Sequence, residues 1–482
     1  MGLTESNNAD DQQIKDRLEQ LRCHFTWKLL FEDSEMPDLE NRILDEMEFL
    51  DTKYNVGIHN ILAYVKHLNG QNEEALECLK NAEDLIQKEQ TDYLDMRSLV
   101  TWGNYAWVYY HMGRLAEAQT YLDKVENACK KFANLFCYTD CPWMDCEEGW
   151  ALMKCGRKNY LRAKACFEKA LEMDPDNPEF SVGYAIIIYR LDCLNRIIQN
   201  SDYAQSLHPL RQAIRLNPED SYLKVLLALK LQDLGEEDEG EKYIDEALSS
   251  QFSQTYVFRY AAKFYRKRGN LEKALQLLKQ AVRNTPASAF LHHQIGLCYR
   301  AQALQIKSAA KMQPRGQDRE NVNRLLKSAI FHFKFAVDQK PTFEIAYLHL
   351  ASMYGEAGNH QEAEDIFQKM LHMTPREEET LQELYLFYGR FQEFQKKSEA
   401  TAIAYYLKAI KLEQPSFTRD KVITSLERLA LKKFRRNPSD LETLSLLGFA
   451  YKLKGELKEA LEYYERALRL AADLENSTEH GP

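Results

Sequence analysis

The 482-residue sequence predicts an all-α superhelix of stacked helical pairs, and three observations lead to this prediction. Small and aromatic residues recur at fixed offsets with a period of about 34 residues. Val and Ile occur at helical rather than alternating spacing, so strand signals are absent. Asp-Pro and Asn-Pro dipeptides at Asp174, Asn177 and Asn217 mark expected helix ends.

The period and its residues are those of the tetratricopeptide repeat, a helix-turn-helix unit. The clearest copy has Gly448 and Tyr451 on its first helix, Gly455 at the turn, and Ala460 and Tyr464 on its second helix. Small residues let the two helices approach closely, while an aromatic ring fills the gap between pairs. Further clear copies span residues 102–125, 255–286 and 350–375, and weaker ones begin near residues 57, 145, 180, 221, 292 and 383.

A single repeat leaves one apolar face uncovered, so the repeats must stack into an α-solenoid with a concave inner wall. We expect an N-terminal helical cap at residues 1–56, repeats that line a binding site at 57–285, and C-terminal repeats at 286–482. The last part contains an insertion at about 301–327, and insertions of this kind map to one face of a solenoid.

Charge is distributed unevenly along the chain. The 63 basic and 73 acidic residues give a formal net charge of -10, which argues against a general binder of polyanions. Residues 1–50 hold 5 basic and 13 acidic side chains, net -8, whereas residues 251–340 hold 17 basic and 4 acidic ones, net +13. An acidic protein with a basic inner surface is therefore expected.

Signatures of catalysis and metal binding are missing. The chain has no GxxxxGK[ST] loop, GxGxxG turn, GxSxG elbow or HExxH helix. Neighbouring carboxylates such as Glu147 and Glu148 are expected on a solvated helix face. The ten cysteines lack zinc spacing and are interpreted as free thiols. We therefore expect no enzyme activity, no cofactor and no metal site.

The sequence indicates a cytoplasmic protein that does not contact membranes. It has no apolar run long enough to cross a bilayer, and its acidic N-terminus lacks the features of a signal peptide. The first residues, MGLTES, fit the pattern for myristoylation at Gly2. The acidic residues that follow disfavour a lipid anchor, because a single acyl chain without a basic patch binds membranes only marginally.

Residues 150–158 place a tryptophan beside three cations. Trp150 stands where these repeats usually carry a core Leu, so simple packing is one interpretation. Lys154 follows one helical turn later on the same face, and burying a lysine without an anionic partner is costly. The other interpretation is a wet, ligand-filled space that both side chains face, with Arg157 and Lys158 nearer its rim.

A second cluster, YVFRYAAKFYRKR at residues 256–268, interleaves cations with aromatic rings. Arg259 and Lys263 lie at i and i+4, and the repeat core does not need Tyr256 or Tyr260. Cations for phosphates next to rings for bases are typical of proteins that bind single-stranded RNA. The alternative is a solvated charged stripe.

Two further positions could contribute polar contacts. His293 and Gln294 lie just inside an expected first helix, and neutral His and Gln side chains can donate and accept hydrogen bonds at ribose or base edges. A pair of histidines is otherwise typical of polar surface. Arg190 ends an apolar helix and could either pair with Asp192 or bind a phosphate bidentately.

Five motifs together resemble the interferon-induced proteins with tetratricopeptide repeats, and the likeness covers nearly the whole chain. The motifs are LRCHFTW, ILAYVKHLNGQNEEAL, MRSLVTWGNYAWVYYHMGRL, TYVFRYAAKFYR and LHHQIGLCYRAQ. The resemblance implies an antiviral effector whose superhelix encloses a basic central tunnel. That tunnel would take up the 5′ end of single-stranded RNA, either a triphosphate or a cap lacking 2′-O methylation, and so inhibit translation by sequestration.

The resemblance also implies roles for residues in the matching motifs. Arg42, Lys154 and Arg190 would hold the phosphate bridge. Trp150 would stack on the cap guanine, Leu50, Thr52 and Ile186 would surround it, and Glu179 would hydrogen-bond its edge. Tyr160 with Arg190 would crowd the first ribose, and the following nucleotides would contact Tyr222, Arg259, Lys263, His293 and Gln294.

Two positions depart from the family pattern, and one motif bears on assembly. Glu46 stands where close relatives carry Gln near the phosphates, and Asp220 replaces an Asn near the guanine, so the preference between triphosphate and cap is open.

YERAL resembles the family's pairing motif through Tyr464 and Leu468, although Tyr464 is also a repeat-core position. The partners implied are RNA 5′ ends, a second copy or a family paralogue, and translation-initiation factors; DNA is not expected.

One other function uses the same fold and charges. A tetratricopeptide adaptor could bind the acidic peptide tails of partner proteins in a basic groove. Competition between capped, unmethylated RNA and such peptides would distinguish the two hypotheses.

Overall fold

The computed structural model describes residues 11–30, 39–40, 43–44, 47, 56–88, 94–132, 141–198, 205–249, 255–373, 378–413 and 416–479. Within these ranges every regular element is a helix, and none is a strand. The predicted all-α tetratricopeptide solenoid is therefore confirmed. The central tunnel and the division into three domains stay predictions.

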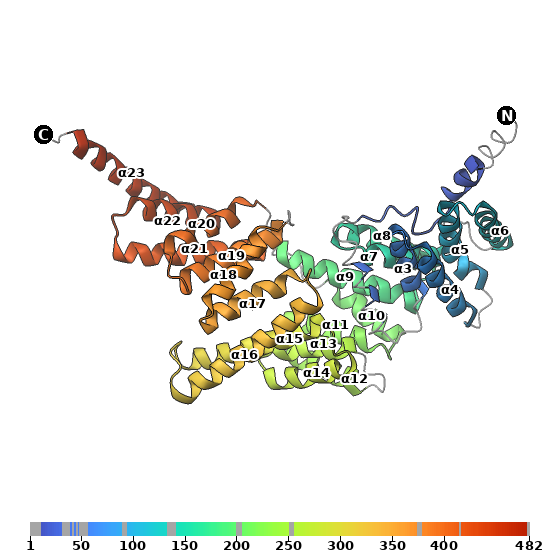
Figure 1. Cartoon of the computed structure of the whole chain (residues 1–482), viewed down its shortest axis with the longest axis horizontal. Coiled ribbons are helices and arrows are strands. Elements are labelled where there is room, and N and C mark those ends of the chain that lie inside the picture. Colours follow the sequence, from blue (N-terminus) through green and yellow to red (C-terminus); the bar gives the residue numbers. More distant parts are fainter. Residues whose placement is uncertain are drawn as a thin grey trace. The chain divides into compact units, whose positions relative to one another are not determined.

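The chain forms two compact units (Figure 1). Unit 1 comprises Met1–Arg196 and Asn200–Pro286, and unit 2 comprises Ile197–Gln199 and Ala287–Pro482. The helices of unit 1 are α3 (Val56–Leu68), α4 (Asn72–Lys88), α5 (Leu94–His111), α6 (Leu115–Phe132), α7 (Pro142–Lys154), the 3-10 helix η3 (Arg157–Asn159), α8 (Tyr160–Met173), α9 (Pro178–Ile198), α10 (Leu207–Leu216), α11 (Ser221–Asp233), α12 (Glu237–Ser249), α13 (Thr255–Lys267) and α14 (Leu271–Asn284).

Unit 2 begins with a pair of long helices and continues in pairs that are shorter. Its helices are α15 (Ala289–Ala309), α16 (Gly316–Gln339), α17 (Glu344–Ala357), α18 (His360–Leu371), α19 (Glu378–Phe394), α20 (Glu399–Lys411), α21 (Phe417–Arg436), α22 (Leu441–Lys454) and α23 (Leu457–Glu479). Most of the insertion expected at about 301–327 is helical: it lengthens α15 and α16 to 21 and 24 residues, against 14 in α17, and residues 310–315 join the two helices.

Close packing of glycines against one aromatic ring joins successive pairs in unit 1. The ring of Phe167, on α8, is fully buried between α7 and α9. A Cβ added to Gly149 would lie 2.9 Å from this ring, and one added to Gly183 would lie 2.2 Å from it. Only residues without a side chain fit there. The predicted role of small residues and aromatics in the repeat is thus confirmed.

The same arrangement recurs in unit 2. A Cβ on Gly296 would lie 2.7 Å from Phe333, and a Cβ on Gly389 would lie 2.5 Å from Tyr406. Both rings are fully buried. The same packing of a first-helix glycine against a buried ring therefore occurs in both units.

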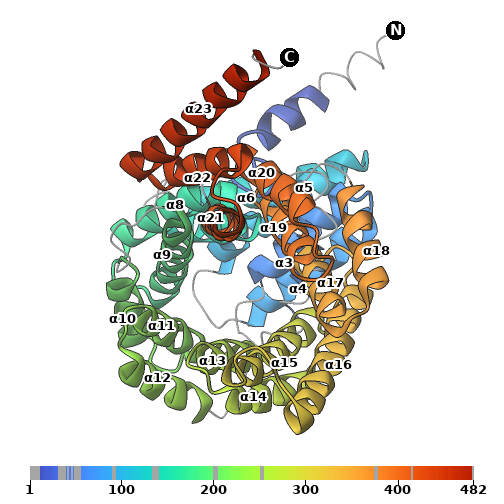
Figure 2. The same cartoon turned by 90° about the vertical axis from the view of Figure 1, so that its left-hand side faces the viewer.

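Unit 1 is curved, and its two layers of helices differ in position. Figure 2 shows α9, α11 and α13 on the inner side of the curve and α10, α12 and α14 on its outer side. Residues that point inward from α9, α11 and α13 can therefore face a common space.

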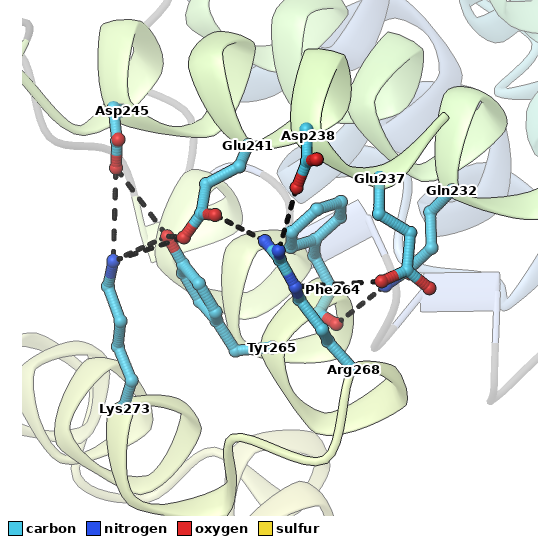
Figure 3. Close-up of polar contacts among 9 residues, drawn as sticks. All are labelled: Gln232, Glu237, Asp238, Glu241, Asp245, Phe264, Tyr265, Arg268 and Lys273. Atoms are coloured by element: carbon cyan, nitrogen blue, oxygen red, sulfur yellow. Dashed lines mark hydrogen bonds and ion pairs between the residues drawn. The ribbon is translucent and has the colours of Figure 1, made fainter. Parts of the chain in front are cut away.

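Carboxylates from the outer helix α12 neutralise part of the basic stretch of residues 251–340 (Figure 3). Arg268 forms ion pairs with Glu241 and, at 2.9 Å, with Asp238. Lys273 lies 3.8 Å from Asp245. These cations stabilise the contact between neighbouring helices and are not available for an inner surface.

Candidate functional site

Trp150 and Lys154 lie together on α7, as the sequence predicted. The Trp150 ring packs edge-on against Phe167, with centroids 5.5 Å apart. The Lys154 ammonium lies 5.9 Å from the centroid of the Trp150 ring. Trp150 is only partly buried, and Arg157 and Lys158 are exposed. The tryptophan therefore packs against the core and at the same time keeps part of its surface accessible beside a cation.

Arg190, on α9, is held against the start of α8. Its Nη1 donates a hydrogen bond to the carbonyl oxygen of Met153 at 3.3 Å. Its guanidinium lies 5.9 Å from the centroid of the Tyr160 ring. Three consecutive helices thus contribute to one cationic position, and a carbonyl and a ring fix the orientation of the guanidinium.

A buried ion pair lies close to Arg190 in the sequence. Lys230 Nζ lies 2.8 Å from Asp192 Oδ2, and both side chains are almost fully buried. Asp192 also accepts a hydrogen bond from the backbone N–H of Ser206 at 2.8 Å. Asp192 therefore has a structural role that joins α9 to α11, and sequence reasoning missed its partner Lys230.

Glu179, at the first turn of α9, accepts a hydrogen bond from Arg97 Nη1 at 3.3 Å. The guanidinium of Arg97 also lies 4.6 Å from the centroid of the Trp143 ring. The Glu179 side chain is 21% exposed. Arg97 was not singled out from the sequence, although it lies in the motif MRSLVTW, because only the fold brings it to Glu179.

Three tyrosines from α11 and α13 form a cluster with two cations. The Tyr222 ring lies 5.9 Å from Tyr256 and 5.5 Å from Tyr260, edge-on in both cases. The Arg259 guanidinium lies 5.9 Å from the Tyr256 ring and 5.8 Å from the Tyr260 ring, and Lys263 Nζ lies 6.0 Å from Tyr260. The predicted interleaving of cations and rings is therefore present in three dimensions.

The electrostatics of this cluster connect it to α9. Burial lowers the pKa of Lys263, an effect that Tyr260 partly offsets and Lys267 reinforces. Burial raises the pKa of Tyr222, and so does Tyr260, whereas the charge of Arg190 acts in the opposite direction. Arg190 is therefore close enough to act on the tyrosine cluster. An anion bound here would favour the charged form of Lys263 and so offset its burial.

Two other predicted site residues of unit 1 have structural roles, one in the hydrophobic core and one at a helix N-terminus. Ile186 is 4% exposed and belongs to the hydrophobic core of the unit, so little of its surface is accessible. Asp220 caps the N-terminus of α11 by accepting a hydrogen bond from the Leu223 N–H at 3.0 Å. Burial raises the pKa of Asp220. Arg42, Glu46, Leu50 and Thr52 lie outside the described residues.

The remaining predicted residues lie in unit 2. His293 and Gln294 are on α15; His293 is buried, and its Nε2 hydrogen-bonds His349 Nδ1 at 2.9 Å. On α23, the Tyr464 ring packs against Gly448, where an added Cβ would lie 2.8 Å away. Leu468 is 71% exposed. Tyr464 is thus a repeat-core residue, and Leu468 is accessible to a partner.

The expectation that Glu147 and Glu148 lie on a solvated face is wrong. Glu147 accepts a hydrogen bond from Asn60 Nδ2 at 2.7 Å, and burial raises its pKa to about 7. Glu148 forms an ion pair with Arg22 at 3.3 Å. The sequence spacing indicated a polar helix face, but that face packs against other helices of unit 1 instead of water.

The described residues contain no group of three or more His, Cys, Asp and Glu side chains that could hold a metal ion. In the same residues, no helix combines the length and the apolar character that crossing a bilayer requires. The fold and the site together define a tetratricopeptide-repeat protein with aromatic rings and cations on α7, α8, α9, α11 and α13 of unit 1.

Comparisons with known proteins place the chain in a family. Tetratricopeptide repeat models match residues 56–131, 149–177, 345–374 and 441–474, and the model of the N-terminal repeat region of Psidin matches residues 189–313. The human antiviral innate immune response effector IFIT1 is 67% identical over 99% of this chain and 100% of its own length. Human IFIT1 homolog B is 63% identical over 97% of this chain and 99% of its own.

Solved structures agree with these relatives. A monomeric mutant of IFIT1 with Gppp-AAAA is 67% identical, covers 95% of this chain and 100% of its own, and has a TM-score of 0.85. The human IFIT1 dimer with m7Gppp-AAAA gives 67% identity, the same coverage and a TM-score of 0.82. This chain belongs to the family of interferon-induced proteins with tetratricopeptide repeats.

Proposed function

We propose that this protein is an antiviral effector that binds the 5′ end of single-stranded RNA. The observation that carries the proposal is the set of cations held against aromatic rings in unit 1. Lys154 lies over Trp150, Arg190 over Tyr160, and Arg259 over Tyr256 and Tyr260. Cations supply affinity for phosphates, and rings supply stacking surfaces for bases.

The relatives support this choice of ligand. The structures of IFIT1 named above contain capped tetranucleotides, and another human IFIT1 dimer contains PPP-AAAA. At 67% identity over the whole chain, we expect the same class of ligand here. The ligand is a triphosphate or a cap without 2′-O methylation, and its sequestration inhibits translation in the cytoplasm.

Each predicted residue has a role in this proposal. Arg42, Lys154 and Arg190 bind the phosphate bridge, while Trp150 stacks on the cap guanine, which Leu50, Thr52 and Ile186 surround. Glu179 accepts a hydrogen bond from the guanine edge, and its ion pair with Arg97 holds the carboxylate in place. Tyr160, Tyr222, Arg259, Lys263, His293 and Gln294 contact the ribose and the following nucleotides.

Assembly is part of the proposal. α23 exposes three leucines, with Leu457 at 66%, Leu461 at 60% and Leu468 at 71% exposure. Apolar side chains that recur on one helix fit a contact with a second helix. We propose pairing with another copy or with a family paralogue through this helix. Solved structures of human IFIT1 include dimers. Translation-initiation factors are proposed as further partners.

Salt dependence and competition test the proposal. If several phosphates are neutralised, affinity for triphosphorylated RNA falls at least about tenfold between roughly 50 and 200 mM salt. An affinity that does not change with salt contradicts RNA binding by this cationic surface. An acidic peptide that binds and is not displaced by capped, unmethylated RNA would instead favour the adaptor function.

A further inference from the structure

The residues of α7 that are not buried lie almost entirely on one face of the helix. They are Trp143, Glu147, Glu148, Trp150 and Lys154, and the remaining residues of α7 are buried. All except Glu148, whose ion pair is described above, recur at intervals of four, three and four residues. This spacing places their side chains on one face. The α7 stripe, Trp143, Glu147, Trp150 and Lys154, is therefore the part of this helix that a ligand can reach.

Charge changes sign along the α7 stripe. The Lys154 ammonium lies 5.9 Å from the centroid of the Trp150 ring, on the C-terminal side of that residue. Glu147 precedes Trp150 by about one helical turn. In the proposed function the phosphate bridge lies at Lys154 and the guanine on Trp150. The base is then the part of the ligand nearest to Glu147.

Glu147 is held in place by a buried amide. Asn60, on α3, donates from Nδ2 to Glu147 Oε1 at 2.7 Å and to Thr101 Oγ1 at 3.0 Å. Asn60 is fully buried, so this contact is shielded from water. The carboxyl group of Glu147 is therefore oriented before any ligand binds, and little conformational entropy is lost in using it.

Two charged groups from neighbouring helices act on Glu147. Arg97, on α5, and Glu179, on α9, form an ion pair at 3.3 Å. The charge of Arg97 lowers the pKa of Glu147 and that of Glu179 raises it, so both lie within electrostatic reach. Because Arg97 and Glu179 neutralise each other, the three groups together are neutral when Glu147 is protonated and carry one negative charge when it is ionised.

The charge of this group of residues changes near neutral pH. Burial raises the pKa of Glu147 to about 7, although the hydrogen bond from Asn60 opposes this effect. Two thiols also interact with Glu147. Burial raises the pKa of Cys23 to about 12 and raises that of Cys146 well above its usual value, so both stay neutral near pH 7. Among the described groups that act on one another here, Glu147 is thus the one that titrates in this range.

We propose that Glu147 is a specificity-determining residue of the RNA-end site, and that its ionised carboxylate favours a positively charged guanine over a neutral one. Methylation at N7 gives the guanine base a positive charge, so the caps m7Gppp and Gppp differ in the charge that they bring to Trp150. A cationic base is attracted both by the ring of Trp150 and by a net negative charge beside it. A neutral base gains much less. This inference rests on the proposed function and adds a selection between N7-methylated and unmethylated caps.

The test is titration of the full-length protein with m7Gppp-AAAA, Gppp-AAAA and PPP-AAAA at about pH 6 and about pH 8. The measured quantity is the ratio of the affinities for the methylated and the unmethylated cap. Glu147→Gln keeps the size of the side chain and the acceptor for Asn60, and it cannot ionise. At about pH 8 we expect the ratio to be at least about threefold higher for the unaltered protein than for this variant.

The pH profile separates a role of charge from a role in packing. At about pH 6 the two proteins should give similar ratios, because Glu147 is then mostly protonated in both the free site and the variant's neutral equivalent. The proton equilibria of the cap itself are the same for both proteins and cancel in this comparison. Affinity for Gppp-AAAA and PPP-AAAA should be unchanged or higher in Glu147→Gln, since the charge that is removed repels phosphates.

Two further variants serve as controls. Glu147→Asp keeps a carboxylate and should retain part of the preference for the methylated cap at about pH 8. Glu172→Gln removes one negative charge from an exposed position on α8 and should leave the ratio unchanged. Three results overturn the inference: a ratio at about pH 8 that is the same with Glu147→Gln, an equal loss of affinity for all three ligands, or the same effect from Glu172→Gln.

Failure of this inference is distinguishable from failure of the proposed function. Binding of PPP-AAAA to the unaltered protein tests recognition of the RNA end, because this ligand has no cap guanine. A protein that binds PPP-AAAA tightly and whose preference between caps is independent of Glu147 keeps the proposed function and loses only the inference. A protein that binds none of the three ligands loses both.

Discussion

The guanidinium of Arg190 lies 5.9 Å from the centroid of the Tyr160 ring, and its Nη1 donates to the carbonyl oxygen of Met153 at 3.3 Å. The arginine is therefore oriented by two neighbouring helices before any ligand arrives. Preorganised charge binds more tightly than a mobile side chain, because less conformational entropy is lost on binding.

Replacing this arginine is expected to affect every phosphorylated 5′ end alike. Arg190→Ala should weaken binding of triphosphorylated and capped tetranucleotides by at least about tenfold, since it removes a charge-assisted contact. Arg190→Lys should recover only part of this affinity, because an ammonium cannot bind bidentately. Fluorescence anisotropy measures both, with Arg435→Ala, at an exposed position of unit 2, as the control. Unchanged affinity for both RNAs would remove Arg190 from the site.

Trp150 should discriminate between the two kinds of RNA end. Trp150→Ala removes a stacking surface worth about 1–3 kcal/mol per base, so capped RNA should lose much more affinity than triphosphorylated RNA. Trp150→Phe should retain most of the binding. Thermal unfolding must accompany the titration, because Trp150 also packs on Phe167. Equal losses for both RNAs would make Trp150 a packing residue.

Glu147 should make stability depend on pH. Its pKa is raised to about 7 in the folded protein, so the folded state holds a proton that the unfolded state releases near pH 4.5. The contribution of Glu147 to the free energy of unfolding is therefore fully present below pH 4.5 and is lost as the pH rises through about 7.

Glu147→Gln keeps the acceptor for Asn60 and abolishes the titration. The variant should therefore gain stability relative to the unaltered protein between about pH 5 and 8, by about 1–2 kcal/mol. Chemical denaturation at several pH values measures the difference. Glu172→Gln, on the exposed surface of α8, controls for the loss of one surface charge. A stability difference that stays constant with pH would show that Glu147 is ionised throughout.

Gly183 should tolerate no side chain. Gly183→Ala places a Cβ 2.2 Å from the buried ring of Phe167, and we expect a loss of about 1–3 kcal/mol in stability from overpacking. Gly57→Ala is the matched control, because its Cβ would meet only Glu147 Cγ at 3.9 Å. Thermal unfolding should show a clear fall in Tm for the first variant and little change for the second. Similar Tm values would mean that the Phe167 ring has room to move.

The sequence predicted those features that depend on spacing within one helix or one repeat. Trp150 and Lys154 share a face because they are four residues apart, and the repeat pattern predicted that small residues would pack against aromatic rings, as the glycines around Phe167 do. For the same reason, the alternation of Arg259 and Lys263 with tyrosines on α13 could be predicted from the sequence.

Contacts between distant helices were not predictable from a single sequence. Nothing in the spacing indicates that Arg97 meets Glu179, 82 residues away, or that Lys230 meets Asp192. The net charge of residues 251–340 was also a misleading guide to the charge of the inner surface, because Asp238 on α12 forms an ion pair with Arg268 of this basic stretch. Local pattern fixes the face on which a side chain lies, whereas its partner depends on which helices pack together.

The most direct test of the account compares tetranucleotides that differ only at the 5′ end: triphosphate, unmethylated cap, 2′-O-methylated cap and hydroxyl. Titration of the unaltered protein at one fixed salt concentration should give tight binding to the triphosphate, the unmethylated cap or both, and binding to the hydroxyl end that is at least about a hundredfold weaker. Equal affinity for all four ends would contradict recognition of the RNA 5′ end by unit 1.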